Sequence, residues 1–334
     1  MIELARLRRV TLLLVVPAVL LTACGTNPRS SPPSPPASSA SLPAATGPTV
    51  TTASGVQVTG SFGQVPKVVV PATPAPSALT QQTITQGTGA TVVAGDTLVA
   101  NYIGQTWALK SGKVDVFDSS FARAQPLAGV IGEGHLISGW DKALVGKKVG
   151  SRVVLTIPPA DGYGTAGQPS VGITGTDTLV FVIDLIAAYG PNASAPGTVV
   201  PNIPTAGLPK ITNVPGRAPA IVSMTGVKAP ATPTSTLLVT GGGAKIDTTK
   251  TLVFQYVETD IATGKVGRSS WGQAPQTESA TSLLGIVDKL DGQKIGARAL
   301  VLLPATPAIP ATASTPAEPA VAPMVLIIDV VGQF

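Results

Sequence analysis

The sequence predicts a protein of the α+β class with two small domains built mainly of strands. Its 334 residues suffice for two domains of ordinary size, ~150 residues each. Thr, Ala, Gly, Val and Pro dominate the composition, which favours strands and turns over long helices. A weak internal repeat places similar segments in the same order in both halves of the chain, which indicates a duplicated fold.

The composition excludes several function classes. The net charge is only +5, and no cluster of Lys and Arg is present, so nucleic acid is not an expected partner. One cysteine excludes an internal disulfide, and one histidine excludes a multi-histidine metal site. The sequence contains no Ser/His/Asp triad motif and implies no cofactor.

The first residues form an export signal. A basic segment with Arg6, Arg8 and Arg9 precedes an apolar run, Val10–Leu21. That run is too short to span ~30 Å of hydrocarbon as a helix. The run ends in LTACG, which contains Cys24, the single cysteine of the chain.

LTACG resembles the lipobox of bacterial lipoproteins, in which a small residue precedes the cysteine that becomes lipidated. The resemblance implies removal of residues 1–23 and lipidation of the Cys24 thiol. The protein would then be anchored at the outer face of the bacterial cytoplasmic membrane. The alternative is an ordinary secreted protein with an unrelated cysteine.

Composition divides the remaining chain into four parts. Residues 24–54 are rich in Ser, Pro, Ala and Thr and are expected to be a disordered tether. Residues 55–190 should form the first domain, and 191–215 a second low-complexity linker. Residues 216–334 should form the second domain.

The first domain should contain several half-buried strands, because apolar and polar residues alternate along them. One short helix is expected at Gly139–Leu144, ahead of a turn at 146–148. The expected strands are Lys67–Val70, Gln82–Gln86, Thr97–Trp107, Ser151–Ile157 and Thr178–Ala187.

Large rings gather in one window of this domain. Aromatic residues are only 4% of the chain, yet residues 102–181 contain most of them, which predicts one apolar pocket. These rings are Tyr102, Trp107, Phe117, Phe121, Trp140, Tyr163 and Phe181.

The motifs in this window resemble those of the FKBP-type peptidyl-prolyl isomerases. They read NYIG from 101, VFDSSFAR from 116, LISGWDKAL from 136, GSRVVLTIPPADGYG from 150 and TLVFVIDL from 178. The resemblance covers residues 83–189, about a third of the chain. It implies a bent antiparallel β-sheet wrapped around a short α-helix, and prolyl isomerase activity.

Prolyl isomerisation suits this residue set. The barrier of ~18–20 kcal/mol arises from amide resonance, so lowering it requires neither a nucleophile nor a metal. An apolar pocket can desolvate the amide, and a few hydrogen bonds can select its twisted state. Rings, aliphatic side chains and one or two polar groups are therefore expected, without an acid–base pair.

The resemblance implies a role for each pocket residue. Trp140 would form the floor, and the Ile137 backbone N–H would be available to a substrate carbonyl. Tyr163 would offer its hydroxyl to the substrate backbone. Tyr102, Phe117 and Phe181 would form the walls, and Leu136 would be the other rim residue. Asp118 would be the acidic edge, and Arg123 the cation that orients it.

Each of these residues alone has an ordinary alternative role. Trp140 could be simple core packing, Asp118 could belong to a turn or a helix cap, and Tyr163 could be a surface loop ring. His135 is expected to be an exposed loop residue without catalytic work. The joint pattern, in order and spacing, favours the pocket.

Three departures from the family pattern leave rate and macrolide affinity open. The loop between Gly104 and Phe117 is longer than in minimal members. Leu127 and Gly129 stand where rings are common, and Gln168 stands where a histidine is frequent. The implied partners are proline-containing unfolded or exported polypeptides and, as inhibitors, macrolides of the FKBP class.

The second half repeats the scaffold motifs but not the pocket. Matching pairs are 84–102 with 238–256, 145–159 with 290–305, and 179–186 with 324–331. A degenerate, inactive FKBP-like domain is therefore expected. Gly267–Arg268 stand at the place of Phe117–Asp118, and Ile286 or Val287 at the place of Trp140. Leu326 stands at the place of Phe181, and an Ala/Pro/Thr run from Pro304 to Pro323 replaces the Tyr163 loop.

Two other functions fit the same sequence. In the first, both domains hold unfolded or proline-rich clients, as a chaperone or an envelope interaction module, and catalysis is incidental. In the second, the chain is a structural envelope lipoprotein that kept only the scaffold. The joint presence of the pocket residues in the first domain counts against both.

Overall fold

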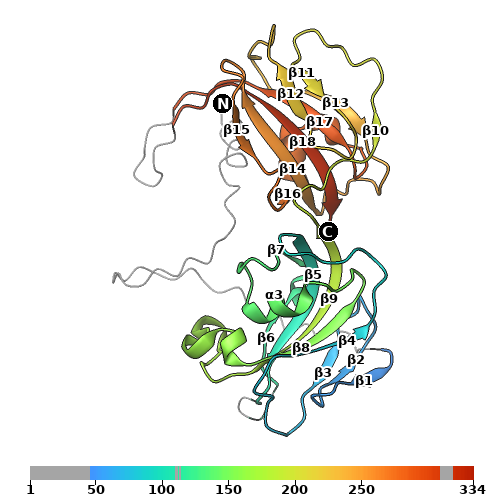
Figure 1. Cartoon of the computed structure of the whole chain (residues 1–334), viewed down its shortest axis with the longest axis vertical. Coiled ribbons are helices and arrows are strands. Elements are labelled where there is room, and N and C mark those ends of the chain that lie inside the picture. Colours follow the sequence, from blue (N-terminus) through green and yellow to red (C-terminus); the bar gives the residue numbers. More distant parts are fainter. Residues whose placement is uncertain (1–45, 110–111, 113, 309–318) are drawn as a thin grey trace.

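The structure is a computed structural model that describes residues 46–109, 112, 114–308 and 319–334. Two bodies built around β-sheets follow one another along the long axis, and the C-terminus lies at their junction (Figure 1). The expected signal peptide, Cys24 and most of the expected tether lie outside the described residues. Within the described ranges, no helix is long and apolar enough to cross a membrane.

The first body contains a six-stranded antiparallel sheet with the order β4-β8-β9-β5-β6, and β7 pairs with β5. Its adjacent strands β5 and β9 are buried along most of their length, and β9 begins with the apolar run 179–183. The strands are β4 (Thr80–Thr85), β5 (Thr97–Thr106), β6 (Val116–Ser119), β7 (Leu127–Val130), β8 (Arg152–Ile157) and β9 (Leu179–Tyr189).

One short helix, α3 (Ser138–Leu144), packs on the inner face of this sheet (Figure 1). The packing is close because Gly139 faces Ile157: a Cβ at Gly139 would lie 2.7 Å from Ile157 Cγ2. The remaining helical segments are α2 (Ser120–Arg123), η1 (Pro159–Asp161), η2 (Gly164–Ala166) and η3 (Pro169–Val171). The sequence therefore predicted the place of α3 to within one residue.

A small three-stranded sheet covers the outer face of the first body. It consists of β1 (Thr49–Thr51), β2 (Gln57–Thr59) and β3 (Lys67–Val69). Val58 and Val68 from this sheet pack with Val154 and other residues of the large sheet. The sequence placed the tether as far as residue 54, but β1 starts at Thr49, so the ordered first body begins earlier than expected.

A buried ion pair fastens this small sheet to the large one. Arg152 on β8 binds Asp184 on β9 with Nε–Oδ1 2.6 Å, and both side chains are fully buried. Arg152 also donates to the carbonyls of Gly60 at 2.6 Å and Gln64 at 2.7 Å, and Asp184 accepts from the Gly63 N–H at 2.7 Å. Buried charges need such partners, so the loop between β2 and β3 completes the hydrogen bonding of the ion pair.

The second body repeats the strand order of the first. Its sheet runs β10-β13-β17-β18-β14-β15, and β16 pairs with β14. From β13 to β15 this is the order of β4 to β6 in the first body, with β16 at the place of β7. The elements are β13 (Thr234–Thr240), β14 (Thr251–Asp260), β15 (Val266–Ser269), β16 (Gln276–Ser279), α4 (Ala280–Ile286), η4 (Asp288–Leu290), β17 (Arg298–Leu303) and β18 (Met324–Gln333).

Residues 191–215 are not a free linker, which corrects the sequence-based expectation. β10 (Thr198–Val199) in this stretch pairs with β13, and β11 (Lys210–Thr212) pairs with β12 (Ala220–Ser223). Apolar side chains hold the stretch on the sheet: Ala195 is fully buried, and Ile203, Leu208 and Ile211 pack against the same core cluster. A proline-rich segment can therefore be ordered by the surface that its scattered apolar residues cover.

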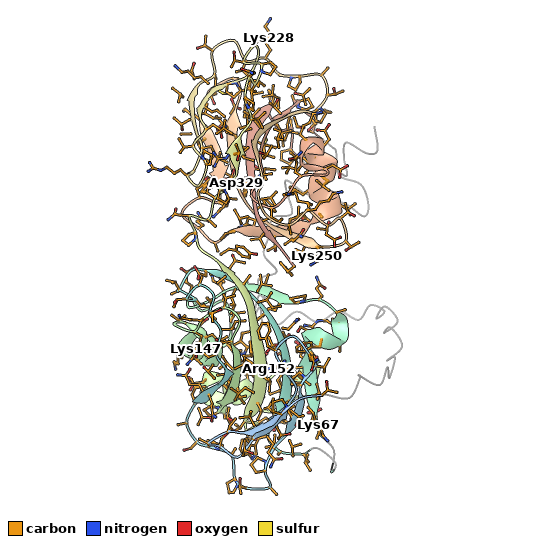
Figure 2. The ribbon with its side chains drawn as sticks, turned by 90° about the vertical axis from the view of Figure 1, so that its right-hand side faces the viewer. Lys67, Lys147, Arg152, Lys228, Lys250 and Asp329 are labelled. Atoms are coloured by element: carbon orange, nitrogen blue, oxygen red, sulfur yellow. The ribbon has the colours of Figure 1, made fainter. Side chains whose placement is uncertain are left out.

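The second body also has a buried ion pair between its central strands. Arg298 on β17 binds Asp329 on β18 with Nε–Oδ1 2.6 Å. Arg298 donates to the Arg217 carbonyl at 2.5 Å, and Asp329 accepts from the Ala195 N–H at 2.8 Å. Arg152 and Asp329, the labelled members of the two pairs, lie among the packed side chains of their bodies (Figure 2).

Candidate active site

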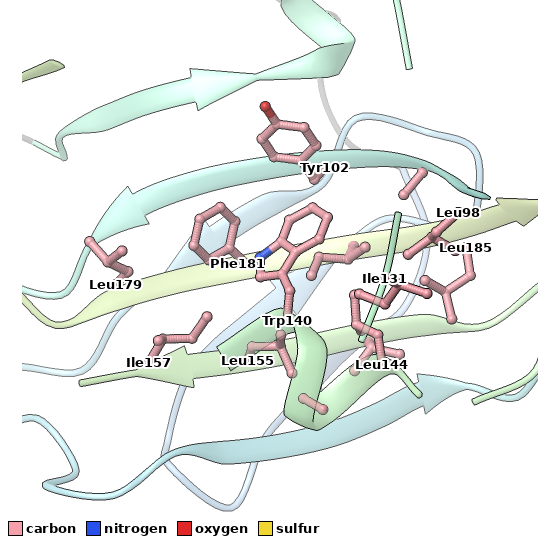
Figure 3. Close-up of a cluster of buried hydrophobic side chains, with 14 of the residues drawn as sticks. Leu98, Tyr102, Ile131, Trp140, Leu144, Leu155, Ile157, Leu179, Phe181 and Leu185 are labelled. Carbon is pink, nitrogen blue, oxygen red and sulfur yellow. The ribbon is translucent and has the colours of Figure 1, made fainter. Parts of the chain in front are cut away.

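Four rings meet between α3 and the inner face of the first sheet. Trp140 on α3 lies edge-on to Tyr102 on β5 and to Phe181 on β9, with centroid separations of 5.3 and 5.5 Å (Figure 3). Phe117 on β6 adds an edge-on contact to Phe181 at 5.5 Å. Edge-to-face packing is the favoured arrangement of aromatic rings, so the four side chains hold one another in place.

A glycine makes room for two of these rings. Gly104, the last residue of the NYIG motif, lies opposite Phe181 in the β5–β9 register and opposite Asp118 in the β5–β6 register. A Cβ at Gly104 would lie 2.7 Å from the Phe117 ring and 2.7 Å from the Phe181 ring. Any side chain at this position would therefore displace these two rings.

Trp140 forms the base of the cluster. Its side chain is only 3% exposed, and its indole Nε1 has no hydrogen-bond partner among the described residues. Buried N–H groups in folded proteins nearly always have a partner. The unpartnered donor indicates a place that a bound molecule or water can occupy.

The segment before α3 forms the rim of the cluster. Leu136 and Ile137 are partly buried and pack against the core. The Asp141 carboxylate accepts from the backbone N–H groups of Gly132 at 2.7 Å and Gly134 at 2.8 Å, so the helix holds this segment in place. Sequence reasoning identified the two rim residues but missed Asp141.

A polar group closes the edge of the cluster. The Tyr102 hydroxyl and the Arg123 guanidinium both bind the Asp118 carboxylate, and Arg123 Nη2 donates to the Tyr102 hydroxyl at 3.0 Å. Burial, together with the hydrogen bond to Asp118, raises the pKa of Tyr102 to about 12. Tyr102 therefore remains a neutral donor at all physiological pH values.

Local structure explains how Arg123 reaches Asp118. The Ser119 side chain accepts from the Ala122 N–H at 3.3 Å and so caps α2, whose last residue is Arg123. Ser120 is fully buried; its hydroxyl accepts from the Tyr102 N–H at 2.7 Å and bonds Asn101 Oδ1 at 3.0 Å. The sequence indicated a turn or cap at Asp118 and did not reveal the hydrogen bonds that join α2 to β5.

Tyr163 lies in the loop between η1 and η2 and packs against the same core. Burial, and secondarily the charge of Asp118, raises the pKa of its hydroxyl. Asp161 fastens this loop to α3, because its carboxylate accepts from Lys142 Nζ at 2.5 Å and from Ser138 Oγ at 3.3 Å. The sequence analysis did not single out Asp161.

The structure thus brings the predicted site residues together but leaves two of the predicted rings, Trp107 and Phe121, outside the cluster. Trp107 packs on the outer face of the sheet, with its Nε1 donating to the Thr73 carbonyl at 2.8 Å. His135 is exposed in the rim segment. Over the described parts of the chain, no group of three or more His, Cys, Asp or Glu side chains could hold a metal ion.

The comparisons with known proteins agree with this geometry. The family of FKBP-type peptidyl-prolyl cis-trans isomerases matches residues 89–186. An FK506-binding protein of Streptomyces anulatus is 38% identical over 122 residues, which are 36% of this chain and 95% of that protein. The chain belongs to the FKBP-type peptidyl-prolyl cis-trans isomerase family.

Two further proteins are similar to the FKBP-type domain. A probable FK506-binding protein of Corynebacterium glutamicum is 40% identical over 129 residues, 37% of this chain and 98% of that protein. The crystal structure of FkpA from Escherichia coli is 36% identical, covers 35% of this chain and 51% of that chain, and has a TM-score of 0.30. The matched family region is the first body, which contains the ring cluster.

The second body places other residues at the positions that build the FKBP-type site. The β14–β18 register sets Glu258 opposite Leu326, as the β5–β9 register sets Gly104 opposite Phe181. Arg268 on β15 binds the Glu258 carboxylate with Nε–Oε2 3.0 Å. A charged pair therefore stands where the first body has a bare glycine and an aspartate.

Proposed function

We propose that this protein is a lipid-anchored, extracytoplasmic peptidyl-prolyl cis-trans isomerase that assists the folding of exported proteins. The observation that carries the isomerase proposal is the four-ring cluster of Tyr102, Phe117, Trp140 and Phe181, with polar groups only at its edge. Such a site can exclude water from a proline ring while leaving donors for the flanking backbone.

In this proposal the apolar cluster binds the proline side chain and removes water from the preceding amide. The planar amide is stabilised by charge separation, which an apolar environment disfavours, so the twisted state is relatively favoured. Trp140 forms the floor, Tyr102, Phe117 and Phe181 form the walls, and Leu136 lies at the rim. The chemistry needs no covalent intermediate.

Hydrogen bonds then select the twisted state. The Ile137 backbone N–H and the Tyr163 hydroxyl would bind carbonyls of the substrate backbone, and the unpartnered Trp140 Nε1 adds a third donor. Asp118, oriented by Arg123 and Tyr102, would lie beside the substrate amide. The raised pKa of Tyr163 keeps its hydroxyl protonated and therefore able to donate.

The proposed ligands follow from the same site. Proline-containing unfolded or exported polypeptides are the substrates, and macrolides of the FK506 class are the expected inhibitors, since related proteins are named for FK506 binding. Leu127 and Gly129 lie beside the pocket, and Leu136 packs over Gly129 with a side-chain carbon 3.1 Å from the Cβ position. This side of the pocket is aliphatic, which should weaken macrolide stacking.

The anchoring proposal rests on the LTACG motif around Cys24, which lies outside the described residues. Cys24→Ser should abolish lipid attachment and release the protein or leave its precursor unprocessed. Labelling cells with a fatty-acid analogue tests this, and equal labelling of the variant would exclude the lipobox. Lipid attachment at Cys24 would place the isomerase at the outer face of the cytoplasmic membrane.

The second body is proposed to be a degenerate FKBP-like domain without isomerase activity. Its strand order supports this, as do Glu258 and Leu326 at the positions of Gly104 and Phe181. These same replacements favour a second candidate function for this body, the holding of client chains. In that case catalysis by the first body would serve clients held nearby.

An isomerisation assay on proline-containing peptides with the full mature chain tests the proposed function. Activity that is lost in Trp140→Ala and strongly reduced in Asp118→Val supports it. A folded wild-type chain that fails to accelerate isomerisation in several peptides would favour the client-holding function. Circular dichroism of each variant controls for unfolding.

A further inference from the structure

The two bodies meet at one corner of the FKBP-type domain. Thr97, the first residue of β5, is 3% exposed, and its hydroxyl donates to the Pro275 carbonyl of the second body at 3.0 Å. Tyr189, the last residue of β9, pairs with Thr97 and faces Gly332 near the end of β18. Figure 1 shows the start of β5 and the ends of β7 and β9 facing the region of β16 and β18.

Gly332 allows a close approach at this junction. A Cβ at Gly332 would lie 2.1 Å from the Tyr189 hydroxyl and 2.2 Å from its Cζ, so the tyrosine ring lies directly on the backbone of β18. The connecting residue, Pro191, is also held, because its carbonyl accepts from Gln255 Nε2 at 2.9 Å and from the Gly272 N–H at 3.1 Å. The second body therefore docks through several contacts.

The residues that support the rim segment lie at the same corner. Thr97 pairs with Val130, the last residue of β7, and the next residue, Ile131, is fully buried beside Trp140 in the core. The Ile131 N–H donates to the Asp96 carbonyl at 3.0 Å, and the Ile131 carbonyl accepts from the Gly95 N–H at 2.8 Å. The first turn of the rim segment therefore rests on residues 95–97.

The rim residues depend on this short strand. β7 has only four residues and pairs only with β5 among the described strands. Leu136 lies over Gly129 in the middle of β7, and the Gly132 and Gly134 amides fold back to Asp141. A shift of the corner at Thr97 would therefore move Leu136 relative to Trp140, whereas Ile137 stays with α3 because its carbonyl accepts from the Trp140 N–H at 2.9 Å.

We propose that the second body acts as a positioning element for the isomerase pocket: by docking on Thr97 and Tyr189, it fixes the strand corner that sets the rim residue Leu136 against Trp140. This inference rests on the proposed isomerase function of the first body. It gives the second body a role in catalysis that requires no pocket of its own. The junction residues are positioning residues and do not touch substrate.

The test uses two variants of the full chain that disturb the junction from opposite sides. Thr97→Val removes the hydroxyl that binds Pro275 and keeps a β-branched side chain in the strand. Gly332→Leu forces the Tyr189 ring away from β18. Matched controls are Thr240→Val, which removes a hydroxyl bond to the Thr198 carbonyl inside the second body, and Gly285→Ala, where a Cβ meets no atom within 4 Å.

Hydrogen exchange of the rim amides, residues 131–137, is the direct measurement. Loss of a buried hydrogen bond should speed their exchange roughly fivefold in Thr97→Val, and more in Gly332→Leu, while both controls match the wild type. Exchange in β8 reports global unfolding and should stay unchanged. The proposal would be overturned if the rim amides of both junction variants exchanged at the wild-type rate.

Kinetics provide the second readout. Because the rim contacts bound peptide in both the ground and the transition state, KM should rise about threefold in the junction variants while kcat changes less. Equal loss of kcat with unchanged KM would contradict the rim as the coupled element. If the wild type itself were inactive, the proposed function would fail, whereas the exchange experiment would still decide the positioning role.

Discussion

The two sheets of this chain share a scaffold and differ in what they place against it. In both, a buried serine accepts from the backbone N–H of a tyrosine on the central strand: Ser120 from Tyr102 at 2.7 Å, and Ser270 from Tyr256 at 2.8 Å. Both sheets also contain a buried Arg–Asp pair between adjacent strands. The two sheets therefore contain the same kinds of polar bonds on corresponding strands.

The difference lies on the inner face. The core cluster around α3 in the first body contains five rings, whereas the cluster around α4 in the second body contains aliphatic residues and two rings, Phe254 and Tyr256. The rim segment also differs: seven residues separate β7 from α3, but β16 leads directly into α4. Scaffold and pocket are thus separable, because they use different residues on opposite faces of the same strands.

The largest expected effect tests the shared scaffold. Arg152→Met should destabilise the first body by ~3–5 kcal/mol, because it leaves the buried Asp184 carboxylate without its cation. Arg298→Met should do the same to the second body through Asp329. Denaturant unfolding, with hydrogen exchange to assign each transition, measures both.

The matched control for these variants is Lys142→Met, which removes an ion pair whose lysine is 60% exposed. Exposed pairs contribute ~0–1 kcal/mol, so this variant should unfold almost like the wild type. If the arginine variants were equally mild, the ion pairs would not define the scaffold of either body.

The second test separates stability from catalysis. Trp140→Ala should destabilise the first body by ~3–5 kcal/mol and abolish isomerase activity, because it removes both a buried ring and the pocket floor. Ile286→Ala on α4 should destabilise the second body by ~2–5 kcal/mol. Under conditions where both bodies remain folded, kcat/KM of Ile286→Ala should be close to wild type. Activity lost in both variants would place a catalytic contribution in the second body.

A smaller effect is expected at the pocket edge. Asp118→Val and Tyr163→Phe should each lower kcat/KM about tenfold, equivalent to ~1.4 kcal/mol of transition-state stabilisation. The counterpart of Asp118 in the second body is Arg268, and Arg268→Val should leave kcat/KM unchanged. Steady-state assays of the three variants show whether catalysis depends on the edge of the first body alone.

The smallest effect concerns pH and the second body alone. Burial raises the pKa of Glu258, and Arg268 offsets this only in part. A raised carboxyl pKa favours the protonated form in the folded state, so the associated stability is present below about pH 4.3 and is lost as pH rises through the folded pKa. Glu258→Gln should therefore stabilise the second body at pH 7–8 and make no difference near pH 4.

Thermal unfolding of Glu258→Gln at several pH values measures this effect. Destabilisation at pH 7–8 would show that the ion pair with Arg268 outweighs the burial of the carboxylate. Glu278→Gln, at a partly buried position of β16 outside the pair with Arg268, is the control for a simple change in net charge.

The sequence predicted the ring cluster because its motifs place the rings at the spacing that the family resemblance implies. Trp140, Phe181 and Asp118 were identifiable in this way, whereas Asp161 was not, since an aspartate before a glycine reads as a turn. The outer-face segments were missed for a physical reason. Arg298 reaches Arg217, 81 positions away in the chain, and no local pattern reveals that such a distant carbonyl orders a proline-rich stretch.

Gly104 also bears on the order in which this architecture can change. A side chain there collides with both Phe117 and Phe181, so the glycine can be replaced only after the rings have become smaller. On the proposal that the second body is a degenerate copy, its Glu258, Gly267 and Leu326 would mark the state reached after such a replacement. A phenylalanine returned to position 267 or 326 would then meet the Glu258 side chain, so single substitutions could not rebuild the ring cluster in arbitrary order. Under that proposal the loss of the cluster would be effectively irreversible, because only a few compatible orders of substitution lead back.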